Sequence, residues 1–600
     1  MSTPVTVHSD LNGQQNPLHG EEFSLEQKEY LAGFFSGLSQ RLPYVGHTAT
    51  GQLTADPGTG AANIAVPTFH GTPVEDLCRE EGWKYEQNPL QIWDALVAHA
   101  NEDRAPAPAD LFRFKFHGLF YVSPAQDSFM LRLRVPGASL TTHQLRGLAE
   151  MTEDWGSGRT DITTRANLQI REFRPRDIVR VLNKVQALGM SSRGAGADNI
   201  RNITASPLSC LDATELIETV PYAEALNQYI LNSPDLYDLP RKFNVAFDGG
   251  GTISVVADTN DIGFLAVRVP EGKELPAGVY FRVVLCGITG HRQFATDCGL
   301  LIRPHEAVAV AAAMIRVFSA NGNRTDRKKA RLKYLVDEWG VDKFLEETEK
   351  LLAFPLMRLA AEDCEPRQAI DRAAHIGVHP QAQPKLHYIG VSVPVGQLPA
   401  QQMRALADLA DEYGTGELRL TVWQNLILPN IPSAKLEAAK AALIAAGLSF
   451  EAGRVLAGTV ACTGNQGCRF AATDTKKHAV ALANHLDTHF KITQPVNLHV
   501  TGCHHSCAQH YIGDIGLLGV KIGGEEGYQV NLGGGSDQDQ GLARELIAAV
   551  RFTELPALME QLFASYVAQR LSAEETFLAF TRRHTIEQLR AFAQMEGVAR

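Results

Sequence analysis

The chain contains one long stretch of sequence twice, and this duplication restricts its fold more than any other feature. LRVPGASLTTHQLRGLAEMTEDWGSGRTDITTRANLQI (133–170) aligns without a gap with VSVPVGQLPAQQMRALADLADEYGTGELRLTVWQNLIL (391–428), at an offset of 391 − 133 = 258 residues. The same offset places Gly189 on Gly447 and Cys210 on Cys468. A repeat of domain size that occurs only twice excludes a solenoid of short units. The sequence therefore predicts two related units about a pseudo-twofold axis.

Each copy has the pattern of an α+β unit. A strand is followed by an amphipathic helix with leucine and alanine at helical spacing, a Gly-x-Gly turn and a strand of alternating residues. We predict an α+β fold in five segments: an N-terminal helix within 24–42 and an extended linker (1–75), a first half-domain (76–180), a first larger domain (181–350), a second half-domain (351–440) and a second larger domain (441–600).

Size, charge and hydropathy exclude several classes of protein. Six hundred residues, 44% of them hydrophobic, are too many for one core. The chain has neither the ~18 consecutive apolar residues of a membrane-spanning helix nor a basic segment and apolar run at its amino terminus. We therefore expect a cytoplasmic protein with no membrane partner. The net charge of −11 argues against nucleic acid as a partner, because phosphate binding needs a basic surface.

Four of the nine cysteines lie between residues 462 and 507. Cys462 and Cys468 are separated by five residues, and Cys503 and Cys507 by three. So few cysteines cannot form a disulfide framework, so this group of thiols indicates a metal site. Structural zinc sites use spacings of about two to four residues, whereas iron–sulfur clusters accept wider ones. The spacing favours a cluster, and zinc, with His504 or His505 as further ligands, is the alternative.

The loop between the first two cysteines suits a cluster. Gly464 and Gly467 permit close backbone approach, and Asn465 and Gln466 offer amide donors to sulfide. In the first copy Thr204 stands where Cys462 stands in the second. The metal site therefore belongs to the second copy, and we expect the remaining Cys210 to be a small buried residue.

These motifs resemble a known signature. A-C-T-G-N-Q around Cys462 and G-C-x-x-S-C-x-Q around Cys503 are similar to the cluster motif of the sirohaem-dependent nitrite and sulfite reductases. The resemblance extends from about Phe112 to about residue 560 and includes the duplication. It implies two ferredoxin-like half-domains and two sirohaem- and cluster-binding α+β domains, of which 181–350 is the degenerate copy and 441–600 holds the cluster. His504, His505 and Ala508 depart from the family's usual Pro-Asn and Gly, which leaves the ligands intact and puts the cluster potential in doubt.

The resemblance also implies cofactors and a reaction. A [4Fe-4S] cluster would be held by Cys462, Cys468, Cys503 and Cys507, and Cys507 would be shared with sirohaem. The reaction would be the six-electron reduction of nitrite to ammonia, or of sulfite to sulfide. Substrate-side residues of the family match Arg132, Arg201, Lys242 and Asn244. Their roles would be to bind the anion and deliver protons, with Lys242 as the donor through ordered water.

Sirohaem carries many carboxylates and needs a pocket rich in arginine. Arg165 and Gln169 match the family's sirohaem contacts. Further candidates for binding sirohaem stand at strand-like positions. Any single one of them could equally well be an exposed charge on the face of a strand. They are Arg134, Arg171, Arg241 and Arg419.

One position indicates the substrate. Asn244 follows Phe243, as in nitrite-reducing members, where sulfite reducers usually have a second lysine. Sulfite carries more negative charge than nitrite near neutral pH, so one cation fewer suits nitrite. Two rivals remain: a corrin-ring synthase of the same sequence family, which the chain length and Lys242 with Asn244 oppose, and a non-catalytic, zinc-stabilised binding protein.

Two glycine runs bear on the electron source. Residues 249–251 and 533–535 are both GGG, but neither has the G-x-G-x-x-G pattern of a dinucleotide loop, so we predict hairpin turns. With no flavin or nicotinamide domain, the electrons must come from a separate protein, most simply ferredoxin.

Two further groups of residues have ordinary explanations. The basic run 321–340 places Arg324, Arg327 and Arg331 on one helical face, which predicts a solvated surface, with sirohaem or donor binding as the alternative. His478, His485 and His489 follow the first cysteine pair at helical spacing. We expect them to be hydrogen-bonded or exposed rather than metal ligands.

Overall fold

The computed structural model describes residues 67–594, and the helix predicted within 24–42 lies outside this range. The described chain opens with a short hairpin and three helices: β1 (Thr68–Phe69), β2 (Thr72–Pro73), α2 (Arg79–Glu86), α3 (Trp93–Glu102) and α4 (Pro108–Arg113). In the part of the chain that the structure describes, no helix has both the length and the apolar character to cross a membrane.

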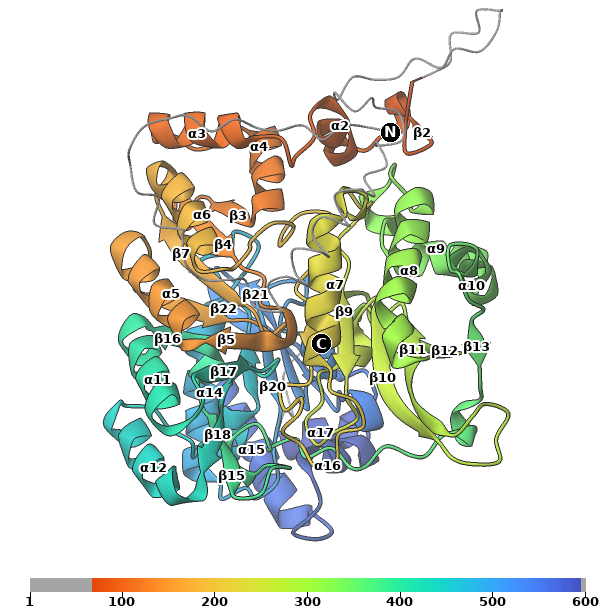
Figure 1. The fold of residues 1–600 in the computed structure, drawn as a ribbon. Coiled ribbons are helices and arrows are strands. Elements are labelled where there is room, and N and C mark those ends of the chain that lie inside the picture. Colours follow the sequence, from red (N-terminus) through yellow and green to blue (C-terminus); the bar gives the residue numbers. More distant parts are fainter. Residues whose placement is uncertain (1–66, 595–600) are drawn as a thin grey trace, which may run out of the picture. The chain divides into compact units, whose positions relative to one another are not determined.

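The duplicated sequences form the same elements in the same order (Figure 1). The first copy contains β3 (Leu119–Val122), β4 (Ser128–Arg132), β5 (Ser139–Thr141), α5 (Thr142–Trp155), β6 (Arg159–Ile162), β7 (Leu168–Phe173) and α6 (Ile178–Ala187). The second contains β14 (Gly377–Pro380), β15 (Leu386–Val391), β16 (Gln397–Pro399), α11 (Ala400–Tyr413), β17 (Glu417–Leu420), β18 (Leu426–Pro432) and α12 (Leu436–Ala445). The predicted α+β duplication is confirmed.

The two half-domains exchange a strand, which the sequence pattern does not reveal. One five-stranded sheet has the order β16-β6-β7-β4-β3, and the other has the order β14-β15-β18-β17-β5. Each sheet thus contains an edge strand from the other copy, paired antiparallel over three residues. Because each copy completes the sheet of the other, the half-domains form one structural unit.

Each copy is followed by a larger domain, and the sheets of the two domains share one topology over five strands, to which the first sheet adds β13. In both sheets the first three strands in chain order are parallel to one another, and each later strand pairs antiparallel with the strand before it. The first sheet contains β8 (Thr204–Ala205), β9 (Val245–Asp248), β10 (Ile262–Val269), β11 (Gly278–Leu285), β12 (Thr296–Ile302) and β13 (Met357–Arg358). The second contains β19 (Thr459–Ala461), β20 (Leu498–Thr501), β21 (Ile515–Ile522), β22 (Glu525–Leu532) and β23 (Arg544–Arg551).

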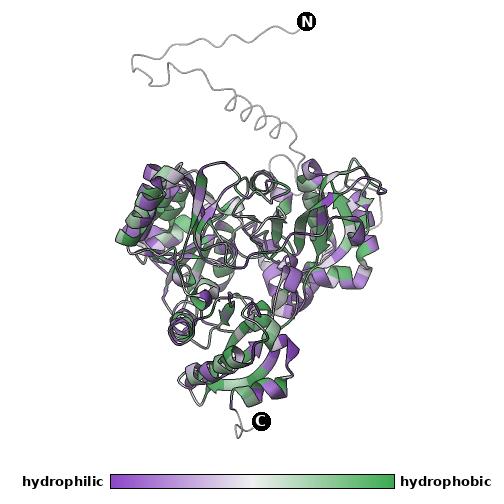
Figure 2. Cartoon of the chain, turned by 90° about the horizontal axis from the view of Figure 1, so that it is seen from below, coloured by the Kyte–Doolittle hydropathy of each residue, from purple (hydrophilic) through white to green (hydrophobic). Residues whose placement is uncertain are grey.

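Helices accompany both of these sheets. Those of the first larger domain are α7 (Val220–Asn232), α8 (Ala307–Asn321), α9 (Leu332–Trp339) and α10 (Val341–Glu349). Those of the second are α13 (Arg454–Ala457), α14 (Thr475–His489), α15 (Leu555–Gln569), α16 (Phe577–Arg583) and α17 (Ile586–Phe592). In Figure 2 many of the helices carry both purple and green along their length, as expected of helices with one buried face.

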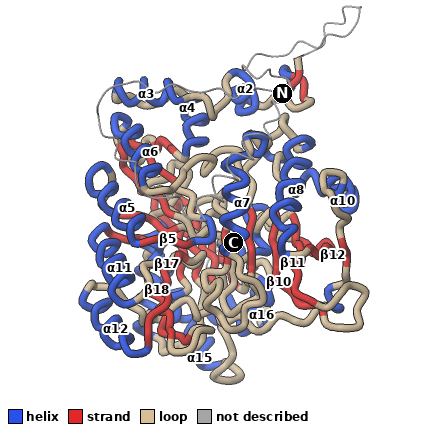
Figure 3. The backbone as a smooth tube through the Cα atoms, viewed as in Figure 1, coloured by secondary structure: helices blue, strands red, loops and turns tan. Residues whose placement is uncertain are grey.

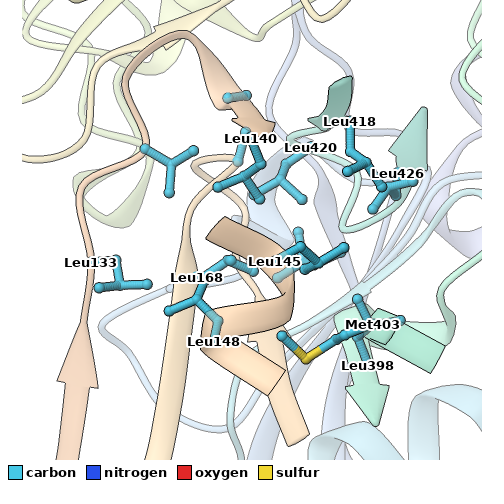
Figure 4. Close-up of a cluster of buried hydrophobic side chains, with 14 of the residues drawn as sticks. Leu133, Leu140, Leu145, Leu148, Leu168, Leu398, Met403, Leu418, Leu420 and Leu426 are labelled. Atoms are coloured by element: carbon cyan, nitrogen blue, oxygen red, sulfur yellow. The ribbon is translucent and has the colours of Figure 1, made fainter. Parts of the chain in front are cut away.

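The largest core lies between the two copies (Figure 4). Leu140, Leu145 and Leu148 of the first copy are buried in one cluster with Leu398 and Met403 of the second. Each fully buried side chain of this kind stabilises the fold by about 1.5–3 kcal/mol. The shared core explains why apolar residues recur at equivalent positions of both copies.

Helices α5 and α11 pack against each other across this core. A capping box in which Thr141 and Gln144 bond each other's backbone starts α5, and Gly156 follows its last residue, Trp155. At the rim, Thr142 Oγ1 donates to Asp411 Oδ1 at 2.8 Å. These two helices directly follow the exchanged strands β5 and β16, so their packing joins the two copies at the strand exchange.

Some boundaries run differently from the sequence segments. Cys78 N donates to Arg324 O at 3.0 Å, so the start of α2 contacts the 181–350 segment rather than the first half-domain alone. β13, from the segment placed with the second half-domain, pairs with β12 of the first larger domain.

Two local expectations were wrong. Cys210 is exposed rather than buried, because it lies in a turn at φ +67°. Residues 249–251 do not form a hairpin turn, since they leave β9, whose neighbour β10 runs parallel to it. Residues 533–535 do lie between the antiparallel strands β22 and β23. In the view of Figure 3, loops drawn in tan fill much of the region that separates β17 and β18 from β10 and β11.

Candidate active site

Two neighbouring parallel strands carry the cysteine loops. β19 ends at Ala461, directly before Cys462, and β20 ends at Thr501, two residues before Cys503. β19 and β20 are parallel neighbours, so their carboxyl ends meet at one edge of the sheet. The fold therefore brings together the two cysteine pairs, which are 34 residues apart in sequence.

The first loop is tied to the second and to α14. Gly502 N donates to Cys462 Sγ at 3.2 Å, and Thr475 Oγ1 donates to Cys462 O at 2.7 Å. Gly464 has φ +72°, and a Cβ there would lie 2.7 Å from Thr475 N. Only glycine fits that position, which accounts for the glycine that the sequence pattern singled out.

The second loop is a tight turn from Cys503 to Cys507. Ser506 N donates to Cys503 O at 3.1 Å, and Ser506 has φ +51°. His505 Nδ1 lies 3.4 Å from Cys503 Sγ, and its ring meets the edge of Phe470 at 5.0 Å between centroids. His505 therefore covers one side of Cys503, and His504 is exposed.

The four thiols are neighbours, but they are too widely spaced for a single ion. Although Cys507 is exposed, the surrounding protein partly desolvates its thiol and raises its pKa to about 11, and the other three thiols raise it further. In the described chain, however, no three of these sulfurs, with or without His504 and His505, lie within 4.8 Å of one another. Two sulfurs on one zinc ion cannot be more than about 4.6 Å apart, because each bond is about 2.3 Å. The donor set fits a cluster whose corners bind one thiolate each, and it does not fit the zinc alternative.

Arg171 of the first copy supports the cluster loop of the second. Its Nη2 donates to Thr463 Oγ1 at 2.7 Å and its Nη1 to Gly467 O at 3.3 Å. Its Nε donates to buried Asp161, which also pairs with Lys476 at 2.7 Å. Burial alone would raise the pKa of Asp161, but Lys476 and Arg171 hold it below its usual value. This ion-paired group clamps the two halves together beside Cys462.

Arg132 and Arg201 hold one short loop, residues 194–197. Arg201 donates to the carbonyl oxygens of Ala195 and Ala197 at 2.7 and 2.8 Å, and Arg132 to Ala195 O at 3.4 Å. Burial lowers the pKa of Arg132 to about 10, and the Cys507 thiol opposes this shift. Burial and then Arg132 lower the pKa of Arg201 well below its usual value. The two guanidinium groups are therefore close to each other, and Arg132 faces the last cluster ligand.

Lys242 and Arg201 are brought side by side by the backbone. Ile200 and Phe243 form a parallel bridge, and Arg201 N donates to Phe243 O at 2.8 Å. Burial lowers the pKa of Lys242 to about 7, Arg331 lowers it further, and the Cys507 thiol opposes both. Asn244 is fixed by its backbone N–H, which donates to Asp261 Oδ2 at 2.8 Å.

Arg165 completes the group, and all of its bonds go to uncharged acceptors. It donates to Asn202 O at 2.6 Å, Asn260 Oδ1 at 2.7 Å and Val245 O at 3.2 Å. Burial lowers its pKa to about 10. Gln169, four residues later in the sequence, accepts from Arg171 at 2.9 Å.

An excess of positive charge is the main feature of this site. Within residues 67–594, four of its cations have no carboxylate oxygen within 4.0 Å: Arg132, Arg165, Arg201 and Lys242. Cations that are partly buried and unpaired are costly unless an anion joins them. The site therefore fits an anionic ligand next to Cys507, such as a tetrapyrrole rich in carboxylates or a small oxyanion.

Other candidate residues serve the protein itself. Arg134 is buried and donates to Asn227 Oδ1 and Ile200 O. Arg241 lies 3.8 Å from Asp198. Asn465 donates to Glu526 at 2.6 Å, and exposed Gln466 contacts Asn465.

Arg419 lies with the degenerate loop rather than with the cluster cysteines. It donates to Ser209 O at 2.6 Å and to Glu417 at 2.7 Å. Its pseudo-twofold equivalent, by the offset of 258, is Asp161. The symmetry of the fold thus places Arg419 beside the loop that lost its cysteine, which differs from the expectation that it lines the tetrapyrrole pocket.

The arginines of the basic run do not form a solvated face, whereas Lys328 and Lys329 of the same run are exposed. Arg324 and Arg331 are buried and pair with Glu81 and Asp261 at 2.7 Å. Arg327 donates two bonds to Asp198, at 2.8 and 2.9 Å. These arginines support the loops that carry Arg201 and Lys242, so their role is structural.

Lys115 was missed at the sequence level. It lies in a short 3-10 turn (Phe114–His117), and its backbone packs over Gly196, where a Cβ would lie 2.4 Å from Lys115 O. Burial lowers its pKa to about 8, as do nearby Arg469 and Arg201, and Asp198 opposes them. No carboxylate of the described residues lies within 4.0 Å of its ammonium group. The sequence signal, one lysine in RFKFHG, is too small to identify it.

A cavity of about 530 Å³ adjoins the Cys462–Cys468 loop. Thr463, Gln466 and Gly467 of that loop line it. The charged residues that line this cavity are Arg159, Asp161, Arg171, Asp474, Lys476 and Lys477. Cations outnumber anions there by two, so the cavity favours an acidic partner.

Comparisons with known proteins agree with this geometry. Residues 196–356 and 452–593 match the nitrite and sulphite reductase 4Fe-4S domain, and residues 121–188 and 379–446 match the nitrite/sulfite reductase ferredoxin-like half domain. The chain is 36% identical to ferredoxin–nitrite reductase of Synechococcus elongatus over 82% of this chain and 96% of that protein. It is 31% identical to the assimilatory ferredoxin-dependent nitrite reductase of Haloferax mediterranei, over 83% of this chain and 90% of that protein.

A solved structure shares the fold. The NirA protein of Mycobacterium tuberculosis superposes with a TM-score of 0.78 at 28% identity, covering 86% of this chain and 98% of that chain. The strand-exchanged duplication, the four cysteines at one sheet edge and these matches together identify the chain as a member of the nitrite and sulfite reductase family.

Proposed function

We propose that this protein reduces nitrite to ammonia with six electrons delivered by ferredoxin. The observation that carries the proposal is the set of unpaired cations beside Cys507, which suits a small anion held next to the cluster. Relatives from Synechococcus elongatus, Zea mays and Haloferax mediterranei, all named as ferredoxin-dependent nitrite reductases, support the same activity.

The chain belongs to a family that works with sirohaem and a [4Fe-4S] cluster, and its residues fit both groups. Cys462, Cys468, Cys503 and Cys507 would hold the cluster, and Cys507 would be the ligand shared with the tetrapyrrole. Arg165 would meet the tetrapyrrole carboxylates. When bound, these groups supply single electrons and an open iron position for the substrate.

Arg132 and Arg201 bind the substrate anion and stabilise the negative charge that grows as N–O bonds break. Their guanidinium groups are held by carbonyl oxygens of residues 194–197, so they are in place before the anion arrives. Lys242 holds the proton that the substrate receives. With a pKa of about 7 its ammonium group releases a proton readily near neutral pH.

Asn244 selects nitrite over sulfite. It lies two residues after Lys242, and its backbone N–H donates to Asp261. An amide there leaves the site with one cation fewer than a lysine would give, which suits the less charged anion.

Ferredoxin docks at the basic cavity beside the Cys462–Cys468 loop. In the described structure Arg159 and Lys477, which line this cavity, have no carboxylate within 4.0 Å, so they are free to meet an acidic donor. Reversing the charge of Lys477 should raise the KM for ferredoxin and leave turnover with methyl viologen unchanged. We assign the protein to the cytoplasm, where thiols that must bind a cluster stay reduced.

The test is steady-state turnover of the coloured, purified protein with reduced methyl viologen, comparing kcat/KM for nitrite and sulfite. A preference for nitrite supports the proposal. Equal use of both anions, or a preference for sulfite, would refute the assignment of nitrite as the substrate and would not affect the assignment of the cofactors.

A further inference from the structure

Three potential metal ligands meet on the surface between α14 and α15. His485 and His489 lie on α14, four residues apart and therefore on one face, and Glu560 lies on α15. One ligand atom from each falls within 4.8 Å of the other two. His485 Nε2 and Glu560 Oε2 are 3.1 Å apart. Two ligands that share one ion, each at about 2.0–2.2 Å, are separated by about 3 Å when cis to each other, so the spacing suits a single ion.

The chemistry of the three residues also suits a divalent metal. His489 Nδ1 lies 2.8 Å from the carbonyl oxygen of His485. Because a carbonyl oxygen only accepts, Nδ1 carries a hydrogen, and Nε2 is the nitrogen left to bind a metal. Metal-binding histidines characteristically use their second nitrogen in this way, which orients the ring. His489 thus directs Nε2, rather than Nδ1, towards a potential ion.

Electrostatics favour a cation at this place. Two neutral imidazoles and one carboxylate carry a net charge of −1, and His489 is the last residue of α14, where the helix dipole attracts positive charge. The rings of His485 and His489 are 4.2 Å apart between centroids, at 37°, so the pair is already gathered. All three side chains are at least partly exposed, which leaves a path for the ion.

We propose that His485, His489 and Glu560 form a binding site for a divalent transition metal, with Zn²⁺ as the ion of best fit. Two imidazoles and a carboxylate leave a further position for water. The site is separate from the cluster cysteines. Thr475, whose hydroxyl bonds Cys462 O, lies on α14 ten residues before His485, which is about 15 Å along the helix axis. A bound ion would join α14 to α15 and so brace the helix that starts at the cluster loop.

The experiment measures zinc binding to the holoenzyme after a chelator wash. Equilibrium dialysis against Zn²⁺ compares the native protein with His489→Ala and Glu560→Gln. His143→Ala, which removes an exposed histidine from α5, is the matched control. We expect one zinc ion more per chain in the native protein and the control, and an affinity at least about tenfold weaker in the two site variants. The visible spectrum monitors the cluster throughout, so zinc taken up by freed cysteines is recognised.

A second measurement separates a built site from scattered surface binding. Zn²⁺ should raise the Tm of the native protein and the control, because an ion that binds only the folded state stabilises it. The shift should disappear in Glu560→Gln, which keeps the hydrogen-bonding shape of the side chain and loses its charge. Equal zinc uptake in all four proteins, or a Tm shift that survives in the site variants, would show that His485 and Glu560 form only a hydrogen-bonded pair.

Discussion

Arg171 of the first copy donates a hydrogen bond of 2.7 Å to the hydroxyl of Thr463, the residue that follows Cys462 in the second copy. Its other bonds reach Asp161, Gln169 and Gly467. One guanidinium group therefore ties the cluster loop to the other half of the molecule. The cluster is assembled in the second copy, but the first copy holds its loop in place.

Arg171→Leu should reduce the iron bound per chain. The substitution removes the bonds to Thr463 and Gly467 and leaves buried Asp161 with Lys476 as its remaining close partner. Breaking a buried pair of this kind costs about 3 kcal/mol. Iron and sulfide analysis of the purified variant measures the effect.

Arg419→Leu is the matched control, because Arg419 is similarly buried and serves the degenerate loop. It should lower Tm and leave iron content unchanged. If Arg171→Leu kept its full iron content, the role given to Arg171 would be wrong.

Lys242→Met should lower kcat and raise the KM for nitrite. The variant loses both a cation of the anion site and the group that holds the proton. Lys242→Arg should restore KM and not kcat, because arginine keeps the charge but does not release a proton. Steady-state kinetics with methyl viologen separate the two effects, and full recovery of kcat in Lys242→Arg would refute the proton role.

Lys115→Met should raise the KM for nitrite by about tenfold, since an unpaired ammonium group near Arg201 attracts an anion. Lys115→Arg should recover most of the affinity. Sirohaem content per chain, read from the Soret absorbance, shows whether the lost contact was to substrate or to the tetrapyrrole. If neither KM nor sirohaem content changed, Lys115 would not be part of the site.

Asn244→Lys should shift preference from nitrite towards sulfite. A second ammonium group beside Lys242 strengthens the binding of the more highly charged anion, and we expect the ratio of specificity constants to change by at least about tenfold. Asn244→Gln serves as a control of size without charge. An unchanged ratio in Asn244→Lys would remove the basis for assigning the substrate from this position.

The stability of the fold should decrease as the pH rises towards 8, because of Asp537. Burial raises the pKa of Asp537 to about 8, Asp258 and Asp248 raise it further, and Arg367 and Ser254 oppose them. A carboxyl group with a raised pKa in the folded state favours folding while it is protonated, and this advantage is lost as pH rises from the unfolded pKa of about 4 to the folded one. Tm measured across this range should fall, and Asp537→Asn should flatten the curve. A variant with the same pH dependence as the native protein would show that Asp537 does not cause it.

Much of the fold was predictable because its signals are local. The offset of 258 residues relates the elements of the two copies directly, as in α5 and α11, which begin at Thr142 and Ala400. Helix and strand periodicity depend on residues two to four positions apart, so sequence alone reveals them. The four cysteines could likewise be identified from their spacing and their glycine neighbours.

Tertiary structure decided the rest, because it depends on residues far apart in the chain. The exchange of β5 and β16 between the two sheets has no local signature, since a three-residue strand pairs equally well with either copy. The same holds for charge. Arg171, Arg327 and Arg419 all appear in the sequence as basic residues on strands or helices, and only their partners distinguish a cluster support, a loop support and a remnant of the duplicated site. The sequence by itself determined that two related units hold a four-cysteine site, whereas the packing of one copy on the other determined which cations remain unpaired beside Cys507. Whether a buried cation supports the fold or binds a ligand depends on whether a carboxylate lies beside it, and the tertiary fold decides that.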